Sequence, residues 1–143
     1  MTYLLDVNVL VALAWPRHVH HLPATQWFTE AHNKGWATTP ITEAGFVRVS
    51  SNPRVFPEGV SPGQAAALLA EFPGVAGHVF WNDTTRLADF TPQFSQYVHG
   101  SGSVTDAHLA CIALVNDASL VTFDAKAAML ADQLGARSLL LQT

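Results

Sequence analysis

The chain opens with the stretch Tyr3-Leu4-Leu5-Asp6-Val7-Asn8-Val9-Leu10, in which a short apolar run passes through one acidic residue into a longer apolar segment. Its first three residues have the unbroken apolar character of a buried strand. The segment from Val7 to Ala14 predicts a helix that ends near Pro16, because proline interrupts the hydrogen bonding of a helix. Together they form the first strand–helix unit of an α/β fold, with Asp6 where the strand ends.

The rest of the sequence repeats this alternation of short apolar runs and helical patterns. Further strands are predicted at Trp36–Thr38, His78–Trp81, Ser119–Phe123 and Ser138–Leu141. Further helices are predicted at His20–Asn33, Pro40–Ser50, Pro62–Phe72, parts of Thr84–Tyr97 with a break at Pro92, Thr105–Asn116 and Ala125–Leu134, and Gly100–Ser103 is expected to be a flexible loop. Strands separated by helices predict one α/β domain over residues 1–143, a three-layer α/β/α arrangement with a central parallel sheet of about five strands.

The composition is that of a packed domain. Nearly half of the residues are hydrophobic and only 13% are charged, which argues against disorder. No apolar run approaches the roughly 18 residues needed to span a bilayer, and the N-terminus lacks the basic start of a signal peptide. Because Cys111 is the single cysteine, an internal disulfide is impossible. We therefore expect a cytoplasmic protein that does not enter a membrane.

The formal net charge of −4 is unusual for a protein that binds nucleic acid, which commonly carries a basic face. This charge argues against broad binding of duplexes without sequence preference. It does not exclude a nuclease, because a cluster of metal-binding carboxylates would itself make the total negative.

Four of the 11 acidic residues fall where one edge of the sheet is expected. Asp6 and Asp124 directly follow strands, Asp106 lies at the start of a helix, and Glu43 lies in the first turns of the helix after the second strand. Because strand ends and helix starts share one edge of a parallel sheet, these carboxylates are expected to converge there. Taken singly, each aspartate is also typical of a helix cap, and Glu43 of a solvated face.

Together the four carboxylates predict a metal-dependent hydrolase. Carboxylates brought together repel one another, and a divalent cation removes that repulsion. Hard oxygen ligands favour Mg²⁺ or Mn²⁺, which can activate water and neutralise charge on a phosphodiester. In this hypothesis all four acids are catalytic, Asp6 and Asp106 bind the metal with Glu43 beside them, and Asp124 completes the site or holds a second ion.

Neighbouring polar residues are candidates for supporting roles. Asn8 either orients Asp6 or a water molecule, or caps the first helix. Thr105 is most simply the N-cap of the helix that carries Asp106, with its hydroxyl facing the site. Thr122, on the last strand before Asp124, is assigned no role.

In order and spacing, the acidic motifs resemble those of the PIN-domain ribonucleases, and specifically the VapC toxins of bacterial type II toxin–antitoxin systems. The opening stretch with Asp6-Val7-Asn8 resembles the first strand of that family, and Thr42-Glu43, Thr105-Asp106-Ala107 and Thr122-Phe123-Asp124 resemble its later motifs. The resemblance covers nearly the whole chain. It implies a PIN-like fold, an Mg²⁺- or Mn²⁺-dependent endoribonuclease acting on transfer or ribosomal RNA, a homodimer, and a cognate antitoxin that covers the active site.

Residues outside these motifs carry weaker signals. Three histidines lack partners at metal-ligand spacing and are interpreted as a solvated helix start: His18, His20 and His21. The tryptophans are interpreted as core or dimer-interface residues rather than base-stacking platforms: Trp15, Trp27, Trp36 and Trp81. Candidates for contact with RNA phosphates, each also compatible with ordinary surface charge, are Arg48, Arg54 and Lys126.

Two other function classes stay open. A phospho-acceptor signalling domain also places acids and Mg²⁺ at such an edge, but it calls for an acidic neighbour of Asp6 and a lysine after the last strand, which this sequence lacks. A non-catalytic PIN-like binding module would keep the fold for protein contacts, and retention of all four acids argues against it. A haloacid-type hydrolase would need a second aspartate where Asn8 stands.

Overall fold

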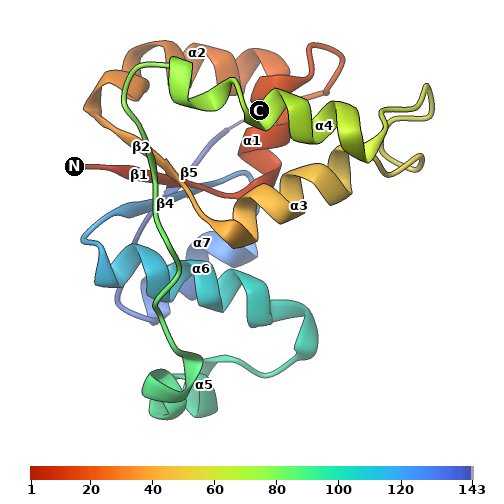
Figure 1. The fold of residues 1–143 in the computed structure, drawn as a ribbon. Helices are drawn as coiled ribbons and strands as arrows, with labels where there is room; N and C mark the ends of the chain where they lie inside the picture. The colour runs from red at the N-terminus through yellow and green to blue at the C-terminus, as the bar shows by residue number, and fades with distance from the viewer. Residues whose placement is uncertain (143) are drawn as a thin grey trace.

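A computed structural model of the chain describes residues 1–142 and shows a parallel five-stranded sheet between two layers of helices (Figure 1). The strands are β1 (Tyr3–Leu5), β2 (Trp36–Thr38), β3 (His78–Phe80), β4 (Ser119–Thr122) and β5 (Arg137–Leu140). Their order across the sheet is β3-β2-β1-β4-β5, and every neighbouring pair is parallel. The predicted α/β/α class and the number of strands are confirmed.

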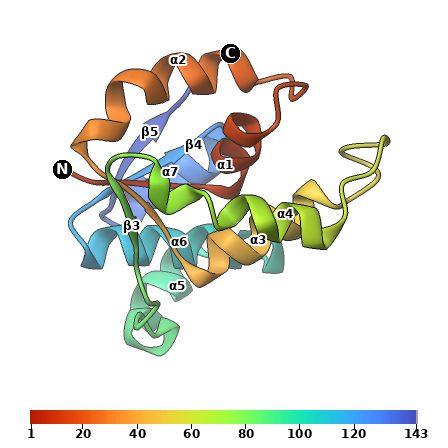
Figure 2. The same ribbon diagram turned by 45° about the horizontal axis from the view of Figure 1, so that its top comes forward.

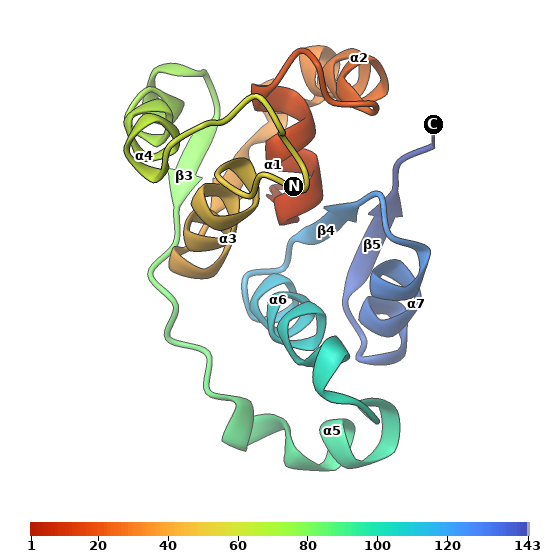
Figure 3. The same ribbon diagram turned by 90° about the vertical axis from the view of Figure 1, so that its right-hand side faces the viewer.

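The helices cover both faces of the sheet. They are α1 (Val7–Ala14), α2 (His21–Ala31), α3 (Pro40–Ser50), α4 (Pro62–Leu69), α5 (Thr91–Tyr97), α6 (Val104–Val115) and α7 (Ala125–Gln133). Figures 2 and 3 show α1 to α4 on one face, α6 and α7 on the other, and α5 on the outer side of α6. Within residues 1–142, none of these helices has the length and apolar character that crossing a membrane requires.

Adjacent residues of β1 anchor the two halves of the core. Leu4 packs in a cluster with Leu109 and Ile112 of α6 and Leu130 of α7. Leu5 packs in a second cluster with residues of α1 and α3, including Phe46. Because successive side chains of a strand point to opposite faces, an unbroken apolar run is required wherever helices cover both sides of the sheet.

Local sequence fixes where the helices begin. Asp6 caps α1 by accepting a hydrogen bond from the backbone N–H of Val7. At α3 the Thr39 hydroxyl accepts from the N–H of Thr42, and Pro40 occupies the first helical position, where no partner for its nitrogen is needed. The helix starts expected at Val7 and Thr39-Pro40 are confirmed.

Some predicted boundaries are wrong. Pro92 does not break a helix but lies in the first turn of α5, where a missing N–H costs nothing. Gly100–Ser103, expected to be a flexible loop, contains a 3₁₀ turn at Ser101–Ser103 that leads into α6. The helices expected to reach Asn33 and Phe72 end at Ala31 and Leu69 and are followed by the short 3₁₀ segments His32–Lys34 and Phe72–Gly74.

The strand order reverses between β1 and β4. From β1 the chain builds β2 and β3 on one side, then returns to place β4 and β5 on the other side of β1. In parallel sheets such a reversal leaves an open space at the carboxyl ends of the two strands, because their connections leave in opposite directions. Asp6 directly follows β1. Asp124 lies two residues after the last residue of β4, because β4 ends at Thr122 rather than at the expected Phe123.

A close approach of α3 to α1 depends on Gly45. A Cβ atom at this position would lie 2.5 Å from Cγ2 of Val7, which is inside van der Waals contact. The missing side chain thus allows α3, which carries Glu43, to pack directly against the first turn of α1. By contrast, a Cβ atom on Gly63 in α4 would meet only the Ser61 hydroxyl, at 3.9 Å.

We expect Gly45→Ala and Gly63→Ala to change stability in opposite directions. Alanine favours a helix over glycine by about 1 kcal/mol, so Gly63→Ala should raise the free energy of unfolding. At position 45 the overpacking against Val7 costs about 1–3 kcal/mol, which outweighs that gain. Urea unfolding of both variants measures the difference, and a Gly45→Ala protein as stable as the parent would contradict the close α1–α3 contact.

Candidate active site

Three aspartates meet at the carboxyl ends of β1 and β4. Asp6 is the N-cap of α1, Asp124 is the N-cap of α7, and Asp106 lies in the first turn of α6. The edge that carries these helix starts faces the viewer in Figure 3. The negative charges of Asp6 and Asp124 both act on Asp106, and the charge of Asp124 acts on Asp6. Of the four carboxylates expected to converge, these three lie close enough for their charges to interact, whereas Glu43 is not among the charges that act on Asp6 or Asp106.

The hydroxyl of Thr122 joins the two strand ends. It donates to Oδ2 of Asp6 at 2.7 Å and accepts from the Asp124 backbone N–H at 3.0 Å and from Nδ2 of Asn8 at 3.2 Å. Its single proton and both lone pairs are thus used. Thr122 is completely buried, so this arrangement is protected from water. One side chain on β4 fixes the carboxylate after β1 and the turn that presents Asp124.

Sequence reasoning missed Thr122. A local signal existed, because a threonine two residues before an aspartate has the spacing of a turn in which the hydroxyl accepts from the backbone. The bond to Asp6, however, joins residues 116 positions apart. It becomes visible only once β1 and β4 are known to be neighbours.

Asn8 supports the same arrangement and does not cap α1. Asp6 occupies the cap position. The Asn8 side chain instead donates to Thr122 and accepts from the Phe123 backbone N–H at 3.2 Å. Of the two roles considered for Asn8, orientation of Asp6 is the one that its contacts fit, and it acts through Thr122.

The surroundings raise the pKa of two aspartates. Burial is the main cause at Asp6, the charge of Asp124 adds to it, and the hydrogen bonds from Thr122 and Val7 oppose it. At Asp106, burial and the charges of Asp6 and Asp124 raise the pKa to about 6. Crowded carboxylates of this kind favour protons or cations over the free anionic state.

Glu43 belongs to a second polar group. Its Oε2 accepts from the Thr38 hydroxyl at 2.7 Å, and Nε2 of His78 lies 2.8 Å from the same hydroxyl oxygen. Since the carboxylate can only accept, Thr38 donates to Glu43 and His78 donates to Thr38 from Nε2. Sequence reasoning missed Thr38 and His78, which lie on the neighbouring strands β2 and β3.

The donor set suits a hard cation. Carboxylate oxygens that repel one another are ligands for Mg²⁺ or Mn²⁺, and Mg²⁺ usually takes one or two carboxylates and keeps several waters. Over the part of the chain that the structure describes, no three His, Cys, Asp or Glu side chains form a ready-made ligand cluster. Asp6 and Asp106 provide two carboxylates, which fits a cation that retains water.

Other sequence expectations have mixed outcomes. The expectation that Thr105 caps α6 is wrong, because Ser103 occupies the cap position and Thr105 lies within the first turn. The side chains proposed to contact RNA phosphates are all exposed on the surface: Arg48, Arg54 and Lys126. The histidines do mark the start of α2, but their side chains are half-buried rather than solvated: His18, His20 and His21.

Comparison with known proteins identifies close similarity over most of the chain. The family model described as PIN domain matches residues 3–132. Ribonuclease VapC39 of Mycobacterium tuberculosis is 50% identical over 87% of this chain and 90% of that protein, and Ribonuclease VapC38 of the same species is 47% identical over 91% and 90%. A solved domain of a functionally unknown protein from Methanocaldococcus jannaschii shares the fold, with a TM-score of 0.54 and 15% identity over 99% of this chain and 91% of that one.

We expect Thr122→Val to disrupt the site while keeping the shape of the side chain. The variant leaves Asp6, Asn8 and the Asp124 amide without a shared partner, which should lower the free energy of unfolding by about 1–3 kcal/mol. Loss of the donor should also raise the pKa of Asp6 further, as measured by NMR titration. Thr122→Ser, which retains the hydroxyl, is the control, and equal behaviour of the two variants would contradict the role of the hydroxyl.

The raised pKa of Asp106 predicts a pH dependence of stability in the metal-free protein. Because the folded state holds this proton to about pH 6 and the ordinary pKa is 3.8, the Asp106 contribution to stability is full at low pH and is lost as pH rises between these values. Unfolding measured with chelator should show this decrease in the parent and less of it in Asp106→Asn. An equal decrease in the free energy of unfolding with pH in the parent and in Asp106→Asn would contradict this assignment to Asp106. The control is Asp89→Asn, which changes an exposed aspartate.

Proposed function

Because this chain belongs to the VapC family of PIN-domain ribonucleases, we propose that it is the toxin of a type II toxin–antitoxin pair and that it hydrolyses RNA with the help of Mg²⁺ or Mn²⁺. The observation that carries the proposal is the group of three aspartates near the carboxyl ends of β1 and β4. The buried Thr122 hydroxyl joins Asp6 to the Asp124 backbone, and the charges of both residues act on Asp106. This is the position at which parallel α/β folds perform their chemistry.

Asp6 and Asp106 would hold the cation, with Asp124 and Glu43 completing the site. When bound, the cation supplies Lewis-acid activation and neutralises negative charge on the phosphodiester. Thr122 and the Val7 amide each occupy one oxygen of Asp6, which fixes the direction of its remaining lone pairs. Without a cation, the negative charges of these residues repel a phosphodiester at the position of cleavage. A bound cation would therefore strengthen RNA binding at the acidic site itself, in addition to contacts elsewhere on the chain.

Glu43 has a separate task in this proposal. Thr38 fixes its Oε2, while among residues 1–142 its Oε1 has no hydrogen-bond partner. That free oxygen is able to accept a hydrogen bond from a water molecule and so orient the water toward the scissile phosphate. It could then take a proton from this water as a general base. His78 holds Thr38 in place from the other side and is therefore a positioning residue.

The surroundings of the site fit RNA and protein partners. Exposed Arg48, Arg54 and Lys126 are proposed to contact backbone phosphates on either side of the cleaved bond. We further propose that the substrate is transfer or ribosomal RNA, that the protein works as a homodimer in the cytoplasm, and that a cognate antitoxin blocks the acidic site.

The proposal predicts discrete, metal-dependent cleavage of cellular RNA. Purified protein, free of antitoxin, should cut total RNA with Mg²⁺ or Mn²⁺ and stop when chelator is added. Asp6→Asn should slow cleavage by at least about 100-fold, since even residues that only support metal ligands contribute 10- to 100-fold. Asp89→Asn removes an exposed carboxylate in the segment before α5 and should cleave like the parent.

Two results would overturn this function. Cleavage that persists in chelator or in Asp6→Asn would show that the acidic site is not responsible. Absence of cleavage under every metal condition, from protein shown to be folded by circular dichroism, would favour a binding module that keeps the PIN fold without the chemistry.

A further inference from the structure

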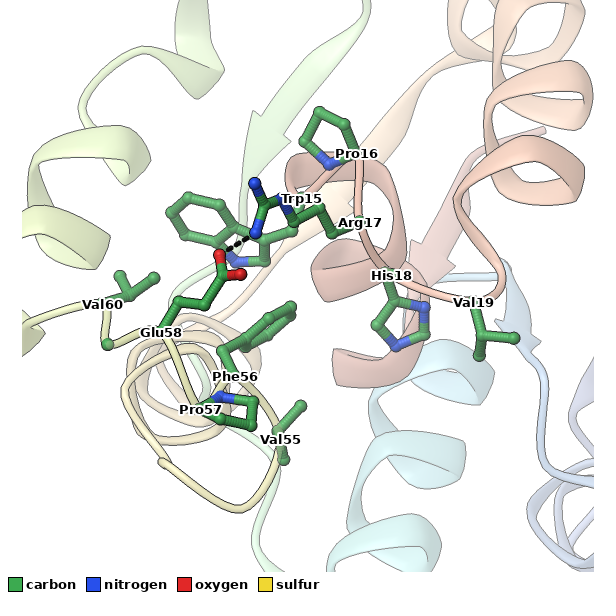
Figure 4. A pocket seen from close by; sticks show the side chains of 11 residues that line it. Trp15, Pro16, Arg17, His18, Val19, Val55, Phe56, Pro57, Glu58 and Val60 are labelled. Carbon is green, nitrogen blue, oxygen red and sulfur yellow. Dashed lines mark hydrogen bonds and ion pairs between the residues drawn. The ribbon is translucent and has the colours of Figure 1, made fainter.

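A large pocket opens between the loops that follow α1 and α3. It has a volume of about 840 Å³ and is lined by residues 15–19 from one loop and 55–60 from the other. Figure 4 shows side chains from both loops around one opening. A pocket of this size accommodates a small aromatic ligand. The function of the acidic site does not require such a pocket.

The walls of the pocket are aromatic and held in place. Trp15 donates from Nε1 to the Ser50 hydroxyl at 2.8 Å and stacks parallel to the buried Phe46 ring, with 6.2 Å between ring centroids. Phe56 lies 6.0 Å from Trp15 and contributes a second ring from the other loop. Because Trp15 is already fixed by these contacts, a planar ligand that packs against it loses little free energy to rearrangement of that side chain.

A row of rings connects this pocket to the acidic site. Phe123, the residue before Asp124, stacks on His20 with 4.8 Å between centroids and 22° between planes. His20 lies 5.6 Å from His18, and His18 lies 6.3 Å from Phe56 in the pocket wall. The side chains of these two histidines and of Phe123 are half-buried, so the row is partly accessible from outside. An extended ligand bound at Asp124 can therefore reach the pocket along aromatic surfaces.

Polar groups lie only at the rim. Arg17 forms an ion pair with Glu58 that joins the two loops across the opening (Figure 4). Nδ1 of His18 accepts from the His20 backbone N–H, so the proton of its neutral ring is on Nε2. Burial and the neighbouring histidines lower the pKa of His18, which favours the neutral ring. The rim thus offers donors from Arg17 and His18 and an acceptor from Glu58.

We propose that this pocket binds an unpaired nucleobase of the RNA substrate, in the single-stranded segment that contains the cleaved bond. The inference rests on the proposed ribonuclease function and names a specificity site for it. Unpaired bases are recognised by stacking on aromatic rings and by hydrogen bonds to their edges, which are the two features that the walls and the rim supply.

The charge of the pocket favours a base over a phosphate. Arg17 and Glu58 cancel each other, and the wall residues carry no formal charge, so the pocket does not attract anions. Arg54 is exposed and precedes Val55 in the chain, and we include it in the proposal as a candidate contact for a nearby phosphate. An apolar protein side chain would fill the walls but would leave the polar rim and the row of rings leading to Asp124 unused.

Direct binding measurements test the pocket without any cleavage. Fluorescence anisotropy with chelator present should report the affinity for labelled single-stranded oligomers of adenosine, cytidine or uridine, about ten nucleotides long. Phe56→Leu removes a ring and should weaken binding of at least one of them by about 5- to 150-fold, the contribution of one stacked base. Phe80→Leu, at a half-exposed phenylalanine on β3 outside the pocket, should bind like the parent. Phe56→Leu and the parent should bind an abasic oligomer of the same length with equal affinity.

A second pair of variants tests the pocket even if Phe56→Leu fails to fold. Val19 lines the pocket and is 81% exposed, whereas Val115 on α6 is 60% exposed and outside the pocket. Val19→Glu places a negative charge in the opening and should weaken binding of the oligomers whose affinity depends on Phe56. Val115→Glu should leave that affinity unchanged. Loss of affinity in Val19→Glu together with Phe56→Leu supports the nucleobase pocket.

The outcomes separate this inference from the proposed function. Cleavage that needs metal and Asp6, combined with equal RNA affinity of all four variants and the parent, would leave the ribonuclease intact and overturn the pocket. Base-dependent binding without any cleavage would support the nucleobase pocket and overturn the ribonuclease function. If Phe56→Leu leaves RNA binding unchanged but abolishes self-association seen by light scattering, the pocket is a protein contact and the nucleobase proposal is wrong.

Discussion

The hydrogen bond from Thr122 to Asp6 is the interaction on which the candidate site depends. It joins the ends of β1 and β4, the two strands between which the chain reverses direction across the sheet. The same hydroxyl receives the Asp124 amide and the Asn8 side chain, so two helix starts are aligned by one buried group. Because Thr122 has no further capacity to donate or accept, any change in one partner is felt by the others.

This alignment concentrates negative charge. Asp6 and Asp124 raise the pKa of Asp106, Asp124 also raises the pKa of Asp6, and burial of Asp6 and Asp106 raises both pKa values further. A fold selected for stability alone would separate or pair these groups. The proposed cation and anionic substrate would account for their grouping at the edge where the strand order reverses.

The surroundings of the acids divide into two parts with different chemistry. On one side, Thr38 and His78 direct Glu43 through hydrogen bonds between neighbouring strands. On the other, aromatic rings lead from Phe123 to the pocket between the loops after α1 and α3. In the proposed ribonuclease, the polar side would orient water and the aromatic side would hold an unpaired base.

The sequence by itself determined the strand–helix order, because unbroken apolar runs such as Tyr3-Leu4-Leu5 and caps such as Thr39-Pro40 are local signals that act over a few residues. It also determined that Asp6, Asp106 and Asp124 would lie on one edge, since a parallel sheet places all strand ends together. Only the tertiary structure decided what these acids contact. The partner of Asp6 is 116 residues away, Glu43 is fixed through β2 and β3, and the His18–His20 rings connect to Phe123 of another loop. Such contacts depend on which strands and loops become neighbours, and that is set by the packing of the whole core rather than by any local pattern.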